Sequence, residues 1–187
     1  MATGSHASPS AGLPPAQRLA KGLAALRIFM GSILLANGLA KLFGITTITV
    51  GPYQGNLIDR GAMRFILRFE GLENPANGGP GSEVPGVKPV VRFLLDNFDI
   101  VQWIVTATEL GLGLLLVIGL ARRGAALLAL AQQSLLAVLY ASSNRWIFEQ
   151  PHEYVPLAIL ALVPAGRLWG LDGRLRWRRA RTGRFPF

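Results

Sequence analysis

Residues 28–50 read IFMGSILLANGLAKLFGITTITV, an apolar run in which Lys41 is the only charged residue. A second run, IVQWIVTATELGLGLLLVIGLA at residues 100–121, contains Glu109 as its only charge. Each run is close to the ~20 residues that a helix needs to cross the core of a bilayer. The sequence therefore predicts two membrane-spanning helices, each with one ionisable residue inside it.

Two further apolar runs complete the predicted fold. The third covers residues 124–142, and the fourth begins near Tyr154 and ends near Leu171. Only 16% of the residues are charged, whereas soluble domains have roughly 25%. The predicted class is an all-α integral membrane four-helix bundle at residues 25–172, between a disordered basic leader (1–24) and a basic tail (173–187). Asp99 is the expected N-cap of the second helix.

Basic residues lie on one side of the predicted spans. They precede the first run (Arg18, Lys21, Arg27), separate the second from the third (Arg122, Arg123) and fill the tail, which includes GRLRWRRARTGR. The positive-inside rule then places both termini in the cytoplasm. A signal peptide cleaved near residue 38 is an alternative that would leave three spans. The net charge of +9 fits a tail on anionic lipid, and we expect no nucleic-acid partner.

The loop at residues 51–98 separates the first two spans. Within it, residues 56–69 place Arg60, Arg64 and Arg68 at successive i+4 positions, a pattern that predicts an amphipathic helix at the outer membrane surface. The arginines either anchor this helix to lipid headgroups or attract a small anion from outside. A second short helix is expected at residues 90–98.

The two charges inside the spans are predicted to meet. Lys41 and Glu109 each lie nine residues from the outer end of their run, a depth of about 14 Å. Asn37, Thr106 and Gln133 fall on the same faces or at a similar depth. These five residues either form a structural layer around an ion pair that fixes helix register, or line a pocket for a quinone headgroup and carry its protons.

Small residues lie on the same faces as the polar ones. Gly31 and Gly38 are seven residues apart in the first run, and Gly113 follows Glu109 by four. Small residues allow membrane helices to approach closely. The sequence therefore predicts tight packing between the first two spans.

The composition also limits the chemistry. The chain has no cysteine and two histidines, so thiolate nucleophiles, Fe–S clusters and cysteine-bound zinc are excluded for this chain. We expect no metal site and no covalent cofactor, and a bound quinone is the cofactor that the polar layer suggests.

Three segments resemble a known family. They are RIFMGSILLANGLAKLFG (27–44), ELGLGLLLVIGLARRGAALL (109–128) and AGRLWGLDGRL (165–175). The chain resembles the DoxX family, and within it the DoxD-like branch, through the lysine of the first span, the Glu-x-Gly-x-Gly motif and the closing Gly-Arg-x-Trp-Gly-Leu-Asp motif.

The resemblance implies a prokaryotic protein of the cytoplasmic membrane. DoxD-like members are linked to the membrane subunit of thiosulfate:quinone oxidoreductase, which passes electrons from thiosulfate to the quinone pool. The first functional hypothesis is therefore a quinone-linked oxidoreductase subunit. The alternative is a non-catalytic scaffold or accessory subunit of a larger membrane redox complex. Both imply contact with other subunits, and the lack of cysteine excludes a covalent thiosulfonate intermediate on this chain.

Overall fold

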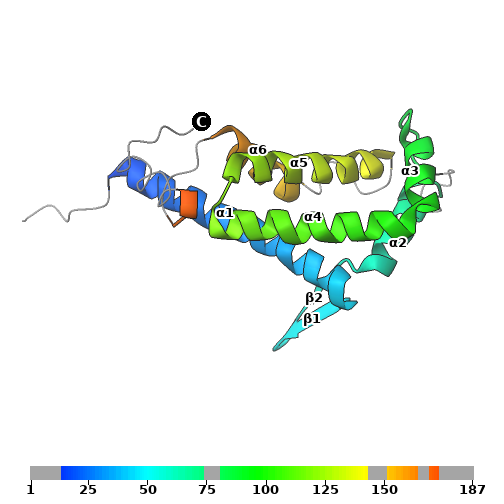
Figure 1. Ribbon diagram of the computed structural model, residues 1–187, viewed down its shortest axis with the longest axis horizontal. Coiled ribbons are helices and arrows are strands. Elements are labelled where there is room, and N and C mark those ends of the chain that lie inside the picture. The colour runs from blue at the N-terminus through cyan, green and yellow to red at the C-terminus, as the bar shows by residue number, and fades with distance from the viewer. Residues whose placement is uncertain (1–13, 74–80, 143–150, 164–168, 173–187) are drawn as a thin grey trace, which may run out of the picture.

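The computed structural model describes residues 14–73, 81–142, 151–163 and 169–172. It is mostly helical (Figure 1), as the predicted class requires, with one two-stranded sheet. The elements are α1 (Pro15–Phe43), β1 (Thr47–Val50), β2 (Tyr53–Asn56), α2 (Arg60–Gly71), α3 (Val87–Asp96), α4 (Phe98–Ile118), α5 (Arg122–Leu139), the 3-10 turn η2 (Tyr140–Ser142) and α6 (Pro151–Leu162).

Three helical segments of the described chain are long and apolar enough to cross a membrane: Ala16–Phe43, Phe98–Ile118 and Arg122–Ser142. They correspond to the first three predicted spans. α6 contains the start of the fourth, but residues 164–168 of that predicted span lie outside the described residues. The helices bury a shared core, which includes Leu34, Leu116, Ala126 and Leu157.

α1 and α4 approach each other at their glycines. A Cβ atom added to Gly113 would lie 2.6 Å from the backbone nitrogen of Leu35, and one added to Gly31 would lie 2.9 Å from the carbonyl oxygen of Gly113. These distances are too short for any side chain, so the two backbones are in direct contact. The predicted close packing of the first two spans is confirmed.

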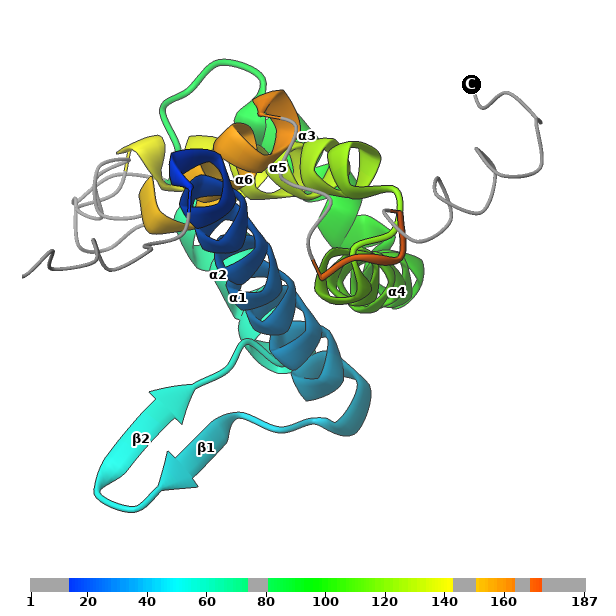
Figure 2. The ribbon, with the colours of Figure 1, turned by 90° about the vertical axis from the view of Figure 1, so that its left-hand side faces the viewer.

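The predicted first span is wrong at its C-terminal end. α1 begins at Pro15 and stops at Phe43, where Gly44 adopts the left-handed conformation with φ 71°. Residues 45–50 are ITTITV, all β-branched, and such side chains favour strands. Thr47–Val50 therefore form β1, which pairs antiparallel with β2, and the hairpin stands away from the helices (Figure 2).

The loop between α1 and α4 contains both predicted short helices, with shifted bounds. α2 begins at Arg60 rather than residue 56, because Tyr53–Asn56 belong to β2 and Asp59 caps the helix by accepting a hydrogen bond from the Ala62 amide at 2.7 Å. α3 ends at Asp96, and α4 starts at Phe98 after the single residue Asn97. The N-cap of α4 is Asn97, and the predicted cap Asp99 lies in the first helical turn.

Candidate functional site

Lys41 and Glu109 form a buried ion pair, as the sequence predicts. The Lys41 ammonium donates to both carboxylate oxygens of Glu109, at 3.1 Å to Oε1 and 2.8 Å to Oε2. Lys41 is 2% exposed and Glu109 is 5% exposed. Each charge is therefore compensated inside the protein and hidden from its surface.

Helix packing positions this pair. Lys41 lies near the end of α1 and Glu109 near the middle of α4. Between them the helices approach at Gly38, where an added Cβ would lie 2.9 Å from the backbone nitrogen of Leu110. The absence of a side chain at Gly38 lets α1 lie directly against the turn of α4 that contains Glu109.

Two further side chains connect the pair to the surface. Gln132 of α5 donates from Nε2 to Glu109 Oε1 at 3.2 Å. The Thr108 hydroxyl lies 3.1 Å from Gln132 Oε1 and 2.9 Å from the Val105 carbonyl oxygen, and its single proton can be donated to either of them. Gln132 is partly exposed and Thr108 is exposed. Lys41, Glu109, Gln132 and Thr108 are called the polar network below. It runs from the buried ion pair to the surface between α4 and α5.

The other three residues of the predicted polar layer do not bond to this ion pair. Asn37 accepts from the Ile58 amide at 3.3 Å and so holds the segment between β2 and α2. Thr106 donates to the Gln102 carbonyl within α4 at 2.6 Å. Gln133 is 9% exposed, and its Oε1 has no partner among the described residues. The sequence placed Gln133 in the polar layer, but the side chain that bonds to Glu109 belongs to its neighbour Gln132.

This correction yields a matched pair of variants. Gln132→Leu removes a hydrogen bond to a buried carboxylate, so we expect it to lower the free energy of unfolding by about 1.5–3 kcal/mol. Gln133→Leu removes a buried carbonyl without a partner, so it should leave stability unchanged or raise it. Thermal unfolding of the detergent-solubilised protein compares them. Equal losses of stability in the two variants would contradict the assignment of Gln132 as the partner of Glu109.

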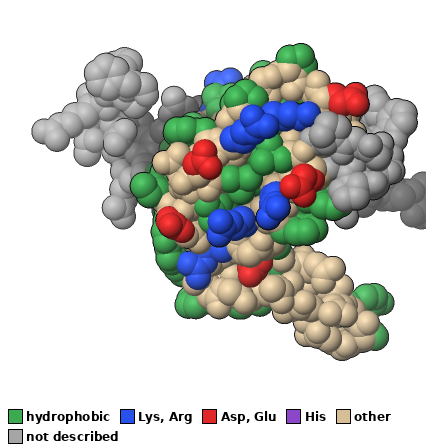
Figure 3. Space-filling model, turned by 90° about the vertical axis from the view of Figure 1, so that its right-hand side faces the viewer, with side chains coloured by type: hydrophobic (Ala, Val, Ile, Leu, Met, Phe, Trp, Pro, Cys, Tyr) green, Lys and Arg blue, Asp and Glu red, His purple; other side chains and the backbone are tan. Residues whose placement is uncertain are grey.

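The three arginines of α2 contact neighbouring side chains. The guanidinium of Arg60 lies over the Trp103 ring at 4.5 Å, and that of Arg64 over the Phe98 ring at 5.3 Å. Arg68 pairs with the exposed Glu73 at 3.4 Å. Figure 3 shows that basic and acidic groups alternate on this end of the molecule. The cation–π contacts attach α2 to the first turns of α4.

An apolar cavity of about 300 Å³ lies between α2, α3, α5 and the turn before α3. Its walls are aliphatic and include Leu67, Val91, Leu135 and Leu136. Leu135 and Leu136 follow Gln132 by one helical turn, on the same side of α5. The cavity is therefore next to the polar network and is suited to a hydrocarbon chain.

A second buried cation lies near the middle of α1, beside Gly119 at the end of α4. Arg27 is 0% exposed, and its Nη2 donates to the Trp169 carbonyl at 2.9 Å. An added Cβ at Gly119 would lie 2.5 Å from Arg27 Nη1, so this glycine makes room for the guanidinium. Asp172 pairs with Arg122 at 3.0 Å. The sequence identified Arg27 only as a basic residue before the first apolar run, because its hydrogen-bond partner Trp169 is 142 residues away.

Comparison with protein-family models, with curated proteins and with solved structures gives no significant match to this chain. Within the described residues, no three His, Asp or Glu side chains are placed to hold a metal ion. The resemblance to the DoxX family rests on the three quoted segments and stays a prediction.

Proposed function

We propose that the chain is a four-span subunit of a prokaryotic cytoplasmic membrane, with both termini in the cytoplasm. The three long apolar helices support a membrane location. α6 packs its Leu157 and Leu160 into the core shared with α1, α4 and α5, which supports a fourth span beginning there. Arg27 contacts Gly119 at the end of α4, close to Arg122 and Arg123 at the start of α5, and a cluster of basic residues at this level is expected for the cytoplasmic side.

We further propose that the polar network binds the headgroup of a quinone. The observation that carries this proposal is the series of polar contacts that leads from Lys41–Glu109 through Gln132 to the exposed Thr108. Gln132 has a second amide hydrogen to donate to a quinone carbonyl at the surface between two spans, and the Thr108 hydroxyl oxygen can accept from the hydroxyl of the reduced quinol. Reducing a quinone to a quinol adds electrons and protons in equal number, and the Glu109 carboxylate is a group that can pass protons to it.

The apolar cavity supports the same ligand. A quinone joins a polar ring to a long isoprenoid chain, and the cavity wall at Leu135 and Leu136 starts one turn of α5 beyond Gln132. A headgroup at Thr108 and Gln132 would direct its chain along the aliphatic side of α5 into this cavity. Pockets that hold such ligands are mainly apolar with few polar groups.

The proposed role is transfer of electrons from thiosulfate or a related sulfur anion to the quinone pool. The basic residues Arg60, Arg64 and Arg68 would attract the anion. Because the chain has no cysteine, the covalent sulfur chemistry belongs to another subunit. The alternative is a non-catalytic scaffold or accessory subunit. It is favoured by the stacking of Arg60 and Arg64 on aromatic rings, which commits them to packing.

Quinone binding by the purified protein tests the proposal. Thr108→Val removes the exposed hydroxyl of the polar network, and Glu109→Gln removes its charge. Each loses a hydrogen bond worth about 1–3 kcal/mol, so we expect quinone affinity to fall roughly five- to a hundredfold. Bound quinone after extraction and titration of a soluble quinone analogue give the two measurements.

Thr106→Val is the matched control, because the Thr106 hydroxyl bonds only to the Gln102 carbonyl within the same helix. It should bind quinone as the unmodified protein does. An equal loss of quinone affinity in Thr106→Val and Thr108→Val would contradict a quinone site at Thr108 and Gln132. Stable protein without quinone, purified with a tightly bound larger subunit, would favour the scaffold. Thiosulfate-dependent quinone reduction by that assembly, sensitive to Glu109→Gln, would support the electron-transfer role.

A further inference from the structure

One wall of the apolar cavity continues the face of α5 that holds Gln132. Leu135, Leu136 and Leu139 follow Gln132 by three, four and seven residues, so the four side chains lie along one stripe of the helix. All three leucines line the cavity. A ligand held at Gln132 therefore meets an aliphatic wall on the side of α5 that leads to Leu139.

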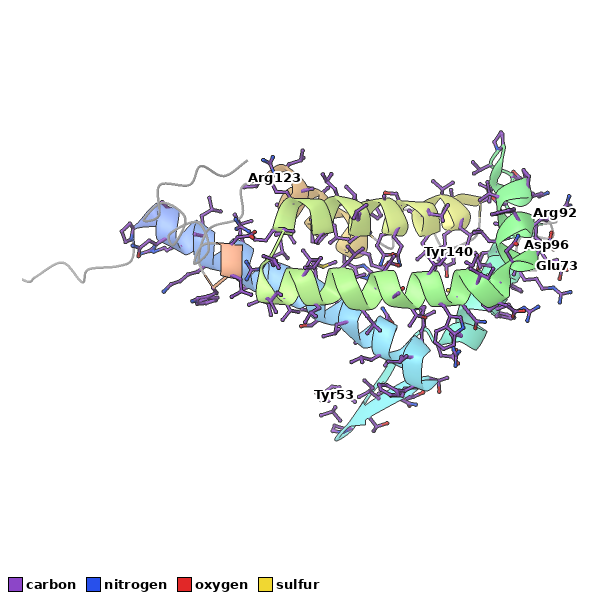
Figure 4. All side chains as sticks on the ribbon, in the orientation of Figure 1. Tyr53, Glu73, Arg92, Asp96, Arg123 and Tyr140 are labelled. Atoms are coloured by element: carbon purple, nitrogen blue, oxygen red, sulfur yellow. The ribbon has the colours of Figure 1, made fainter. Side chains whose placement is uncertain are left out.

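The cavity is closed at the Leu139 end of this wall. Val91 of α3 and Leu139 both line the cavity and are 2% and 4% exposed. A Cβ atom added to Gly71 would lie 2.7 Å from Val91 Cγ2 and 3.0 Å from Leu139 Cδ1, so α2, α3 and α5 pack tightly together here. Figure 4 shows the direction: Arg123 and Tyr140 mark the two ends of α5, and α3 lies at the Tyr140 end.

The cavity is open on one side. Val90, Leu135 and Val138 line it and are only half-buried, at 47%, 51% and 39% exposed. They lie on or beside α5, which is long and apolar enough to cross a membrane. An apolar chain that enters the cavity can therefore leave it sideways into lipid before it reaches the closed end.

We propose that this cavity selects quinones by their isoprenoid chain, and that the chain runs from Gln132 toward Leu139. This inference rests on the proposed quinone site and adds a direction and a length limit to it. The protein recognises only the first part of the chain, because the wall from Gln132 to Leu139 covers seven residues, about 10 Å. Burial of apolar surface favours binding in proportion to the buried area, so a quinone without a chain binds the same headgroup site more weakly.

Two tryptophan substitutions on α5 test the direction of the chain. Leu135→Trp places a larger side chain in the cavity, one turn from Gln132 toward Leu139. Leu128→Trp is the matched control, because Leu128 lies one turn from Gln132 on the opposite side and does not line the cavity. The two leucines are similarly exposed, at 51% and 62%. Each purified variant is titrated with two quinones that share one ring, the first without a chain and the second with a long isoprenoid chain.

The two quinones should respond differently to Leu135→Trp. We expect the affinity for the chain-bearing quinone to fall at least about tenfold, and the affinity for the chainless quinone to change by less than about twofold. Leu128→Trp should change neither affinity. Because each variant is compared with the unmodified protein for the same quinone, differences in partition of the two quinones into detergent cancel.

Val90→Trp fills the cavity from α3 and leaves α5 unaltered. It should reproduce the effect of Leu135→Trp, and so shows that the loss does not come from a displaced Gln132. The length limit is tested with quinones of increasing chain length. The effect of Leu135→Trp should increase with the first isoprene units and then become constant, once the chain has passed the closed end of the cavity.

The outcomes separate this inference from the proposed function. If both Leu135→Trp and Val90→Trp bind the chain-bearing quinone as tightly as the unmodified protein does, the inference is overturned, and a loss of affinity in Thr108→Val still supports the headgroup site. A selective loss in Leu128→Trp would overturn the proposed direction. If the unmodified protein binds neither quinone, the proposed function and this inference both fail.

Discussion

Replacing Lys41 by methionine is expected to cause a large loss of stability. The substitution removes the cation from a carboxylate that is only 5% exposed, at a contact of 2.8 Å. Removing one partner of a buried ion pair costs about 3–5 kcal/mol, because the remaining charge is left uncompensated. Unfolding in mixed detergent micelles, followed by circular dichroism, measures the loss. A decrease of less than about 1 kcal/mol in the free energy of unfolding would indicate that water or a proton compensates the Glu109 carboxylate once Lys41 is removed.

The double variant Lys41→Met with Glu109→Met separates structure from function. Replacing a buried pair by apolar side chains of similar size is often neutral or stabilising, so we expect the double variant to recover most of the loss. The two substitutions should therefore be strongly non-additive. A stable double variant that no longer binds quinone would assign the pair to the site. A stable double variant that binds quinone normally would make the pair a structural contact that fixes helix register.

The sequence predicted the ion pair because each charge stands alone in an apolar helix, where an unpaired charge is costly and a partner of opposite sign is favoured. The equal distances from the ends of the two runs were wrong, since α1 ends two residues after Lys41, whereas Glu109 lies eleven residues from the start of α4. Gly38 and Gly113 were recognised because small residues next to polar ones indicate close helix contact. These features are properties of single helices and are readable without the fold.

Features that depend on rotation about the helix axis were predicted less well. Gln132 and Gln133 have almost the same depth but point about 100° apart, and only the packing of α5 on α4 selects Gln132 as the partner of Glu109. The hairpin was missed because hydropathy treats ITTITV as part of a span, although its β-branching and Gly44 favour a helix end. The partner of Arg27 is a backbone carbonyl, which has no sequence signature.

Gly113→Ala is the second substitution with a large expected effect. Its new methyl group would lie 2.6 Å from the backbone nitrogen of Leu35 and 2.9 Å from the Gly31 carbonyl oxygen. Backbone atoms cannot rotate away as a side chain can, so α1 and α4 must separate. Overpacking typically costs about 1–3 kcal/mol, and we expect the upper part of that range here. The midpoint of thermal unfolding in detergent measures the effect.

Gly111→Ala is the matched control, two residues away on the same helix. An added Cβ at Gly111 has nothing within 4 Å, and alanine is a better helix former than glycine by up to about 1 kcal/mol. This variant should therefore be as stable as the unmodified protein or more so. Similar losses in both variants would mean that glycine matters for helix flexibility rather than for backbone contact.

Gly113→Ala also tests whether the glycine contact holds the ion pair together. Lys41 and Glu109 meet at the same α1–α4 interface, one turn of α4 from Gly113. Separating the helices would lengthen the contact between Lys41 and Glu109. Lys41→Met should then lower the free energy of unfolding less in the Gly113→Ala background than in the unmodified protein. For coupled neighbours we expect a difference of about 0.5 kcal/mol or more. Additive losses would show that the ion pair keeps its geometry without the close approach of the two backbones. The polar network would then depend on α5 and Gln132 more than on the glycine contact.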